Sequence, residues 1–244
     1  MPYLMGGFPD QATATAVAGA YVDAGADLIE LGVPFSDPLA DGPTIHAADT
    51  AALAAGATLE SVLETCAAVG ERVPVALMVY ANMVLATGPA EFAGQAAQAK
   101  ASGVIVPDLP LEEQAPIRDA LGEVGLPLIP LVAPTTPAER RARICAAAEG
   151  FVYLVSTVGV TGEREQLPAE LTDLVAAAKR EASVPVAVGF GISTPEQVAT
   201  VGELADGVII GTRLVRAVAD AADSDAAVAA VADFLRATRH ALSG

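Results

Sequence analysis

Basic residues, cysteine and histidine are scarce in this 244-residue sequence. It has thirteen Lys and Arg residues against thirty Asp and Glu residues, which gives a formal net charge of −17. A nucleic-acid surface needs clustered cations that displace counterions from phosphates, so this balance argues against nucleic-acid binding. The two cysteines and the two histidines lack the spacing of a disulfide framework or a metal site, and we expect neither.

Long apolar runs are also absent, although hydrophobic residues make up 53% of the chain and the mean hydropathy is +0.48. No stretch approaches the ~18 uninterrupted apolar residues of a membrane span. The first residues lack the basic region of a signal peptide. We therefore expect a reduced, cytoplasmic protein with a large buried core and no contact with a membrane.

Short apolar runs alternate with amphipathic, Ala-rich segments along the whole chain. We predict strands near residues 3–5, 27–31, 75–80, 103–106, 128–131, 151–155, 186–188 and 207–210. Helices are predicted at 11–24, 44–53, 59–69, 89–101, 112–124, 137–148, 168–181, 195–201 and 226–242. Eight alternating units favour a closed (β/α)8 barrel in a single domain over residues 1–244, because alternation implies a parallel sheet.

The stretch from Glu30 to Thr44 is the most informative part of the sequence. It reads ELGVPFSDPLADGPT, so a carboxylate at a strand end is followed by a loop stiffened by three prolines. Burial costs a lone carboxylate several kcal/mol or raises its pKa, and no basic residue occurs before Arg72 to pair with Glu30. Glu30 and Asp41 are thus predicted to face one cleft, as an acid/base and an electrostatic anchor.

Two glycine-bearing loops follow the last two predicted strands. They contain Gly189-Phe190-Gly191-Ile192-Ser193 and Gly211-Thr212, and residues 212–218 could form a short extra helix. Loops at these positions, with the N-terminus of such a helix, form the usual phosphate site of a (β/α)8 barrel. A tight turn is the alternative interpretation of each glycine pair taken alone.

A polar loop of about ten residues follows the sixth predicted strand, at 156–165. Loops of this kind at a barrel mouth are often lids that exclude water, and a plain surface loop is the alternative. Tyr153 lies in the preceding strand. We expect its hydroxyl either to point toward the acidic cleft or to form a hydrogen bond within the core.

Five segments together resemble the tryptophan synthase α subunit over essentially the whole chain. They are ELGVPFSDPLADGPTI at 30–45, MVYANMV at 78–84, VPDLPLEE at 106–113, YLVSTVGVTG at 153–162, and VGFGIS at 188–193 with PEQV at 195–198. The resemblance implies a TIM barrel and a lyase of tryptophan biosynthesis that works without metal or cofactor. Its reaction would be the retro-aldol cleavage of indole-3-glycerol phosphate to indole and glyceraldehyde 3-phosphate.

The resemblance also implies roles for individual residues. Glu30 matches the general acid/base, Asp41 the carboxylate that binds the indole N–H, Tyr153 a tyrosine near the reacting carbon, and Tyr3 a position beside the indole. The phosphate-binding positions correspond to Gly162, Phe190, Gly191, Gly211 and Thr212. Positions used in loop closure and subunit communication correspond to Asp37, Asp108 and Thr161.

The partner implied by the resemblance is a β subunit, in an α2β2 tetramer, and pyridoxal phosphate is expected only in that partner. Lys100 and Lys179, the two lysines of the chain, fall in predicted helices, so no Schiff-base lysine is evident. Family members usually carry a helix before the first strand that caps the barrel, and this chain is expected to lack it. Two alternatives stay open: a stand-alone indole-3-glycerol-phosphate lyase, and a non-catalytic barrel that binds the phosphate ligand as an allosteric partner.

Overall fold

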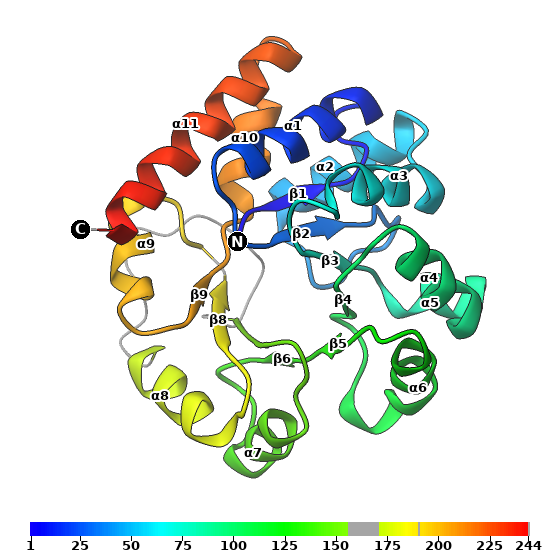
Figure 1. Ribbon diagram of the computed structural model, residues 1–244, viewed down its shortest axis with the longest axis vertical. Helices are drawn as coiled ribbons and strands as arrows, with labels where there is room; N and C mark the ends of the chain where they lie inside the picture. Colours follow the sequence, from blue (N-terminus) through cyan, green and yellow to red (C-terminus); the bar gives the residue numbers. More distant parts are fainter. Residues whose placement is uncertain (156–170, 190, 244) are drawn as a thin grey trace.

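A ring of short parallel strands surrounded by helices forms the molecule (Figure 1). The computed structural model describes residues 1–155, 171–189 and 191–243. The strands are β1 Tyr3–Met5, β2 Ile29–Gly32, β3 Val75–Met78, β4 Gly103–Ile105, β5 Leu128–Ile129, β6 Leu131–Val132, β7 Val152–Val155, β8 Val186–Gly189 and β9 Gly207–Val208. The predicted single-domain (β/α)8 barrel is confirmed.

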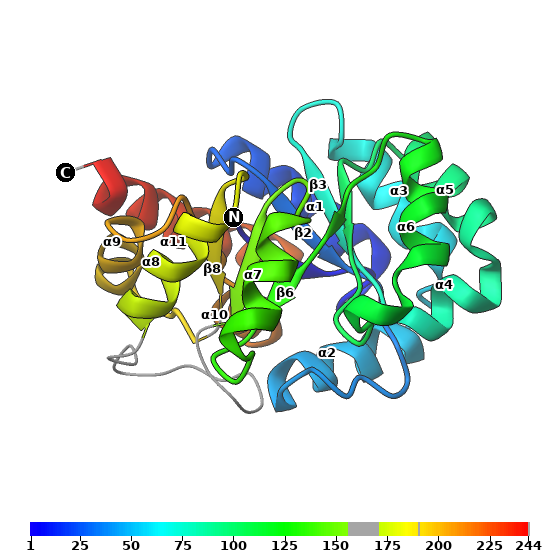
Figure 2. The same cartoon turned by 90° about the horizontal axis from the view of Figure 1, so that it is seen from below.

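The helices run around the outside of this ring, and Figure 2 shows them along its flank. They are α1 Gln11–Asp23, α2 Pro43–Ala54, α3 Leu59–Val69, α4 Ala81–Thr87, α5 Pro89–Gln98, α6 Ala115–Glu123, α7 Ala138–Ala146, α8 Leu171–Glu181, α9 Pro195–Gly202, α10 Thr212–Ala219 and α11 Ser224–Ser243. A single 3-10 turn, η1 Leu111–Glu113, precedes α6.

Backbone hydrogen bonds join the two ends of the sheet into a closed barrel. Strands β1 to β5 pair in order, and so do β6 to β9. The Tyr3 amide donates to the Ile210 carbonyl at 2.9 Å, and the Ile210 amide donates to the Met1 carbonyl at 3.0 Å. On the other side of the ring, Pro130 separates β5 from β6, because proline has no N–H for the ladder. Its carbonyl still accepts from the Tyr153 amide at 3.0 Å, so β5 and β6 are one strand of the barrel interrupted by a proline.

Helix starts follow local capping signals. Thr58 and Ser61 form a capping box at α3, and Thr194 with Gln197 forms another at α9, directly before Pro195. At the start of α1 the Asp10 side chain accepts from the Thr13 amide at 2.9 Å. These contacts satisfy the first amides of each helix, which have no partner within the helix itself.

The core has two main layers and a third, small cluster that includes Met5, Ile45 and Val215. One cluster of buried aliphatic residues fills the space between the strands and the helices, including Ile29, Leu77 and Leu154. A second and smaller cluster, including Ile105 and Ile129, fills the barrel interior. Alternate strand residues face these two layers, since side chains of a strand point to opposite faces with a period of two.

One helix of the structure is absent from the predicted elements. Residues 81–87 form α4, which the sequence analysis missed, directly after β3. It ends at Gly88, whose φ of 94° lies in the left-handed region that favours glycine. Pro89 then starts α5, so Gly88 and Pro89 together separate the short helix α4 from α5.

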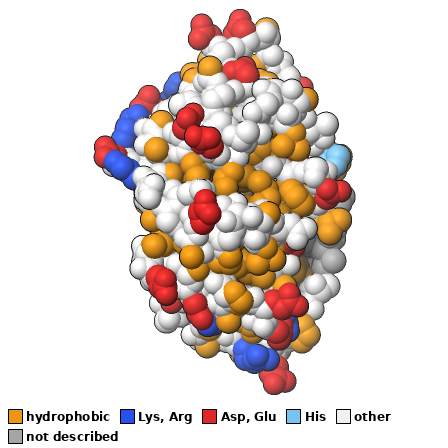
Figure 3. Space-filling model, turned by 90° about the vertical axis from the view of Figure 1, so that its right-hand side faces the viewer, with side chains coloured by type: hydrophobic (Ala, Val, Ile, Leu, Met, Phe, Trp, Pro, Cys, Tyr) orange, Lys and Arg blue, Asp and Glu red, His pale blue; other side chains and the backbone are white. Residues whose placement is uncertain are grey.

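The outer surface is mixed in character. Figure 3 shows the side of the barrel with α4 and α6, where hydrophobic side chains lie across the middle and acidic ones are scattered around them. Leu85 of α4 and Val124, directly after α6, are 56% and 40% exposed. Within the described part of the chain, no single helix has the length and hydrophobicity of a membrane span; α2 and α3 reach that standard only as a pair bent by 106°.

Candidate active site

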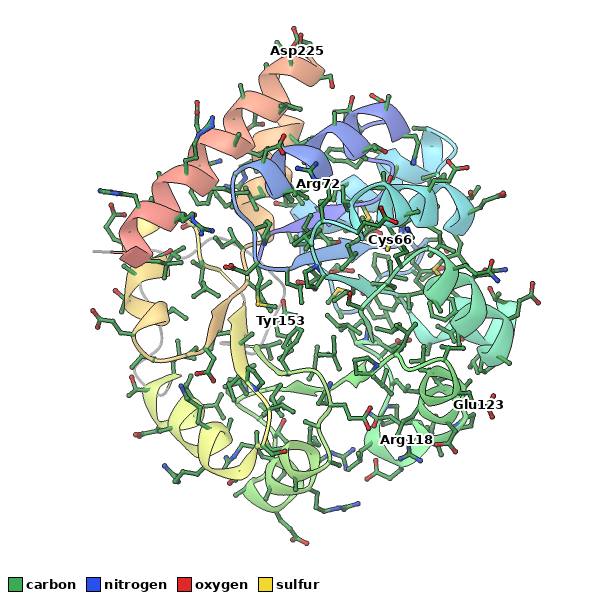
Figure 4. The ribbon with its side chains drawn as sticks, viewed as in Figure 1. Cys66, Arg72, Arg118, Glu123, Tyr153 and Asp225 are labelled. Carbon is green, nitrogen blue, oxygen red and sulfur yellow. The ribbon has the colours of Figure 1, made fainter. Side chains whose placement is uncertain are left out.

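Three polar side chains from three strands point into the barrel interior near its mouth. Tyr3 of β1 pairs in register with Glu30 of β2, and Tyr153 comes from β7. All three are buried, at 6%, 2% and 4% exposure. Tyr153 lies within the ring of strands in Figure 4. The sequence analysis placed Glu30 at a strand end; it is the second residue of β2, so its carboxyl group is held by a rigid element.

These side chains line one cavity together with residues of the loops that follow the strands. The lining consists of Tyr3, Glu30, Asp41, Ile45, Met78, Tyr153, Gly191, Ile209, Gly211 and Thr212. Two acidic groups and two glycines of loops that follow strands thus line the same cavity. The predicted meeting of Glu30 and Asp41 in one cleft is found in the structure.

Two glycines at strand ends make room for the two interior tyrosines. A Cβ atom added at Gly189 would lie 2.6 Å from the hydroxyl oxygen of Tyr153, well inside van der Waals contact. A Cβ atom at Gly32 would overlap the ring of Tyr3. The cavity wall therefore depends on the absence of a side chain at both positions.

Glu30 is held in its neutral form. Its pKa is raised from 4.5 to about 8, mainly by burial and also by the negative charge of Asp41, while the positive N-terminus and a hydrogen bond with Tyr153 lower it. Among the described residues, its Oε2 atom has no hydrogen-bond partner. At neutral pH this carboxyl group can therefore donate a proton into the cavity.

Asp41 has a different environment at the edge of the same cavity. The Tyr80 hydroxyl donates to its Oδ2 atom at 2.7 Å, and the same hydroxyl oxygen accepts from the Ala40 amide at 3.0 Å. Burial raises the pKa of Asp41, while the Tyr80 hydrogen bond and the nearby His46 lower it. Tyr80 thus stabilises the ionised form of this carboxylate and fixes its orientation.

Phe35 and Asp49 extend this group of contacts away from the cavity. The rings of Phe35 and Tyr80 are stacked, with centroids 5.1 Å apart and an interplanar angle of 25°. The Phe35 amide donates to Oδ1 of Asp49, a buried residue of α2, at 3.0 Å. The sequence analysis gave no function to Phe35, Asp49 or Tyr80. An apolar-flanked Asp in a helix next to a Pro-rich loop was the available signal.

The part of the cavity lining formed by Gly191, Gly211 and Thr212 is suited to an anion. Gly191 has a φ of 76°, Gly211 is the N-cap of α10, and Thr212 is its buried first residue. The N-terminus of a helix carries unpaired amides and a partial positive charge, which favour phosphate. The other predicted phosphate residues, Gly162 and Phe190, lie outside the described residues.

Asp37 and Asp108, two of the residues predicted for loop closure, are not among the described residues that line the cavity. Asp37 is exposed in the loop after β2, where it accepts from the Ser36 hydroxyl at 2.6 Å. Asp108 is exposed after β4 and accepts from the Ala81 amide at 2.9 Å, which ties the β4 loop to the start of α4. Thr161, and the predicted lid around it, lie outside the described residues.

No group of three or more potential metal ligands from His, Cys, Asp and Glu occurs among the described residues. Both lysines are engaged at the surface, Lys100 with Glu71 and Lys179 with Asp206. Neither lines the cavity. The groups available for proton transfer in the described part of the cavity are Glu30, Asp41 and the tyrosines.

Sequence and structure comparisons agree with this geometry. The family described as "Tryptophan synthase alpha chain" matches residues 1–242. The tryptophan synthase alpha chain of Geobacillus kaustophilus is 47% identical over 241 residues, covering 96% of this chain and 90% of the relative. Roseiflexus castenholzii has a tryptophan synthase alpha chain that is 46% identical over 242 residues, with coverage of 98% and 92%.

Solved structures give the same result. Tryptophan synthase of Mycobacterium tuberculosis superposes with a TM-score of 0.91 at 36% identity, covering 99% of this chain and 91% of that chain. The tryptophan synthase subunit alpha of Legionella pneumophila superposes with a TM-score of 0.90, also at 36% identity and with coverage of 99% and 91%.

Proposed function

Because this chain belongs to the tryptophan synthase alpha chain family, we propose that it cleaves indole-3-glycerol phosphate to indole and glyceraldehyde 3-phosphate. This is a carbon–carbon lyase reaction of tryptophan biosynthesis. The observation that carries the residue assignment is Glu30, a carboxyl group 2% exposed, with a pKa of about 8, at the wall of the mouth cavity.

Glu30 acts first as an acid and then as a base. In its neutral form it donates its proton to C3 of the indole ring, which turns the ring into a cation. The resulting carboxylate then takes the proton of the side-chain hydroxyl while the carbon–carbon bond breaks and the aldehyde forms. The substrate proton restores the neutral Glu30, so the cycle is balanced without a metal or an external base. Positioned proton transfer of this kind contributes roughly 10²- to 10⁴-fold in rate.

Asp41 stabilises the cation that forms after protonation. Its Oδ2 atom is occupied by the Tyr80 hydroxyl at 2.7 Å, which leaves Oδ1 to accept from the indole N–H. An ionised carboxylate facing positive charge in a dry site supplies an electrostatic stabilisation of several kcal/mol. Tyr3 and Tyr153 pack beside the indole and the reacting carbon.

The phosphate end of the substrate binds at the loops that carry Gly191, Gly211 and Thr212. Support comes from their place in the cavity lining and from the start of α10 at Thr212. Gly162 and Phe190 belong to the same proposed site. Asp37, Asp108 and Thr161 are proposed to take part in loop closure and in communication with the partner.

The proposed partner is a tryptophan synthase β subunit, in an α2β2 tetramer, with pyridoxal phosphate in the β subunit alone. The mouth loops at 34–43 and 108–112 would form part of the contact. Leu39, 89% exposed in the first of these loops, supports an interface there. The cytoplasm is the proposed location. In support, Cys66 and Cys145 are buried free thiols, which fits a compartment that keeps cysteines reduced.

Indole release from indole-3-glycerol phosphate by the purified chain tests this proposal, with and without a β subunit. We expect slow release by the chain alone and a large increase when β is added. A fast reaction that β leaves unchanged would indicate a self-sufficient lyase. No release in either condition would refute the proposed activity.

A further inference from the structure

We propose that Asp49 is a positioning residue for Asp41, acting through the Phe35–Tyr80 ring stack. The inference deepens the proposed function, on which it rests, because it names what holds the indole-binding carboxylate in its working orientation. Asp49 itself touches neither the cavity nor the substrate.

The position of Asp49 is unusual for an aspartate. It lies in the second turn of α2, 1% exposed, among residues that pack against the barrel. Its Oδ1 atom accepts from the Phe35 amide at 3.0 Å, and within the described part of the chain its Oδ2 atom has no partner. A half-satisfied buried carboxyl group is costly for folding, so its contact with the loop is the feature that calls for explanation.

The amide that Asp49 binds belongs to the loop that presents Asp41. Phe35 lies three residues after the end of β2, and Pro34, Pro38 and Pro43 stiffen the segment that leads from β2 into α2. Anchoring the Phe35 backbone to α2 therefore fixes where the Phe35 ring lies. That ring stacks on Tyr80 at 5.1 Å between centroids.

Tyr80 completes the connection to the cavity. Its hydroxyl donates to Asp41 at 2.7 Å and accepts from Ala40 at 3.0 Å, so a tilt of the ring would move both groups. The three residues thus form one continuous set of contacts from α2 to the carboxylate. Misplacement of a reacting or stabilising group by about 1 Å can cost roughly 100-fold in rate.

The role of Asp49 needs its accepting oxygen and not its negative charge. The pKa of Asp49 is raised to about 7, mainly by burial; the hydrogen bond from the Phe35 amide lowers it and the charge of Asp41 raises it. An asparagine would keep the accepting oxygen without the charge. The positioning role therefore predicts that Asn, but not Ala, can replace Asp49.

The test compares Asp49→Ala and Asp49→Asn with wild type, in the complex with the β subunit. We expect Asp49→Ala to lose about 10- to 100-fold in kcat, with little change in the affinity for glycerol 3-phosphate, which has no indole. Asp49→Asn should stay within about threefold of the wild-type kcat. Thr238→Ala is the control, because it also removes a buried polar contact, the Thr238 hydroxyl to the Leu235 carbonyl at 2.8 Å, far from the mouth.

Crystal structures of the wild type and Asp49→Ala give a readout that does not depend on activity. The hydrogen bond between Tyr80 and Asp41 should be broken in the variant, and its persistence would overturn the inference even if the proposed reaction failed. An Asp49→Ala kcat within threefold of wild type would overturn it while leaving the proposed function intact. If Asp49→Ala does not fold, Phe35→Leu keeps the amide and removes the stack. The kcat of that variant should fall to a similar degree. A kcat equal to that of the wild type would refute the proposed set of contacts from Asp49 to Asp41.

Discussion

Replacing Glu30 with Gln should make this protein inactive and, with rising pH, more stable than wild type. Glu30 is 2% exposed, and its pKa is about 8 in the folded chain against 4.5 for the free side chain. Below pH 4.5 both the folded and the unfolded chain keep the proton, so the stability contribution of Glu30 is fully present. As pH rises, the unfolded chain releases the proton first, and stability is lost until the folded chain also releases it near pH 8.

The size of this effect follows from the two pKa values. At about 1.4 kcal/mol per pKa unit, their difference corresponds to a loss of roughly 5 kcal/mol in the free energy of unfolding. Gln has nearly the same shape and no proton to lose, so the variant should not show this loss. Asp49, whose pKa is raised to about 7, is present in both proteins, and its contribution cancels in the comparison.

The assay is urea unfolding followed by circular dichroism, for both proteins, at a series of pH values from 5 to 9. The stability advantage of Glu30→Gln should grow by several kcal/mol over this range. Binding of glycerol 3-phosphate should survive in the variant, while indole release should stop. Parallel pH dependences in the two proteins would mean that Glu30 is already ionised in the folded chain at neutral pH, which would refute its assignment as the acid.

Three further predictions concern the same cavity. In the wild type, kcat/KM should fall above an apparent pKa near 8, because protonation of indole C3 needs the acid form of Glu30; a profile of indole release that stays flat to pH 9.5 would contradict this. Asp41→Asn should lower kcat by about 10²- to 10³-fold with the affinity for glycerol 3-phosphate nearly unchanged, and equal losses in both would indicate a structural role. Gly189→Ala should cost about 1 to 3 kcal/mol in thermal or urea unfolding, since its methyl group would press on Tyr153 at 2.6 Å, and a neutral effect would show that the ring moves freely.

Much of the barrel could be predicted from the sequence because its signals are local. Each strand is a short apolar run, and several helices open with Thr-Pro or a capping residue that acts within one turn. Alternation of the two then implies a parallel sheet, and Glu30 in a strand with Asp41 in the loop that follows it come to one mouth. These inferences need only sequence spacing and the geometry of the fold.

The contacts that were missed depend on segments far apart in sequence. Nothing near Tyr80 indicates that its hydroxyl meets Asp41, 39 residues earlier, or that its ring stacks on Phe35. Helix α4 was missed because seven residues between a strand and Gly88 are too few for a clear helical period. The division of one barrel strand at Pro130 was missed for the same reason, because the part before it, β5, pairs with β4 and the part after it, β6, pairs with β7.

The hydrogen bonds that close the ring have a consequence for how the chain can be made. The Tyr3 amide finds its partner carbonyl at Ile210, so one edge of β1 stays unpaired until nearly the whole polypeptide has left the ribosome. Pairings between such distant segments form slowly, and an uncovered strand edge can pair with another chain in the meantime. Because β1 pairs with a segment near the C-terminus, the chain is most prone to aggregation during synthesis. A chaperone that covers the unpaired edge of β1 would act in that period.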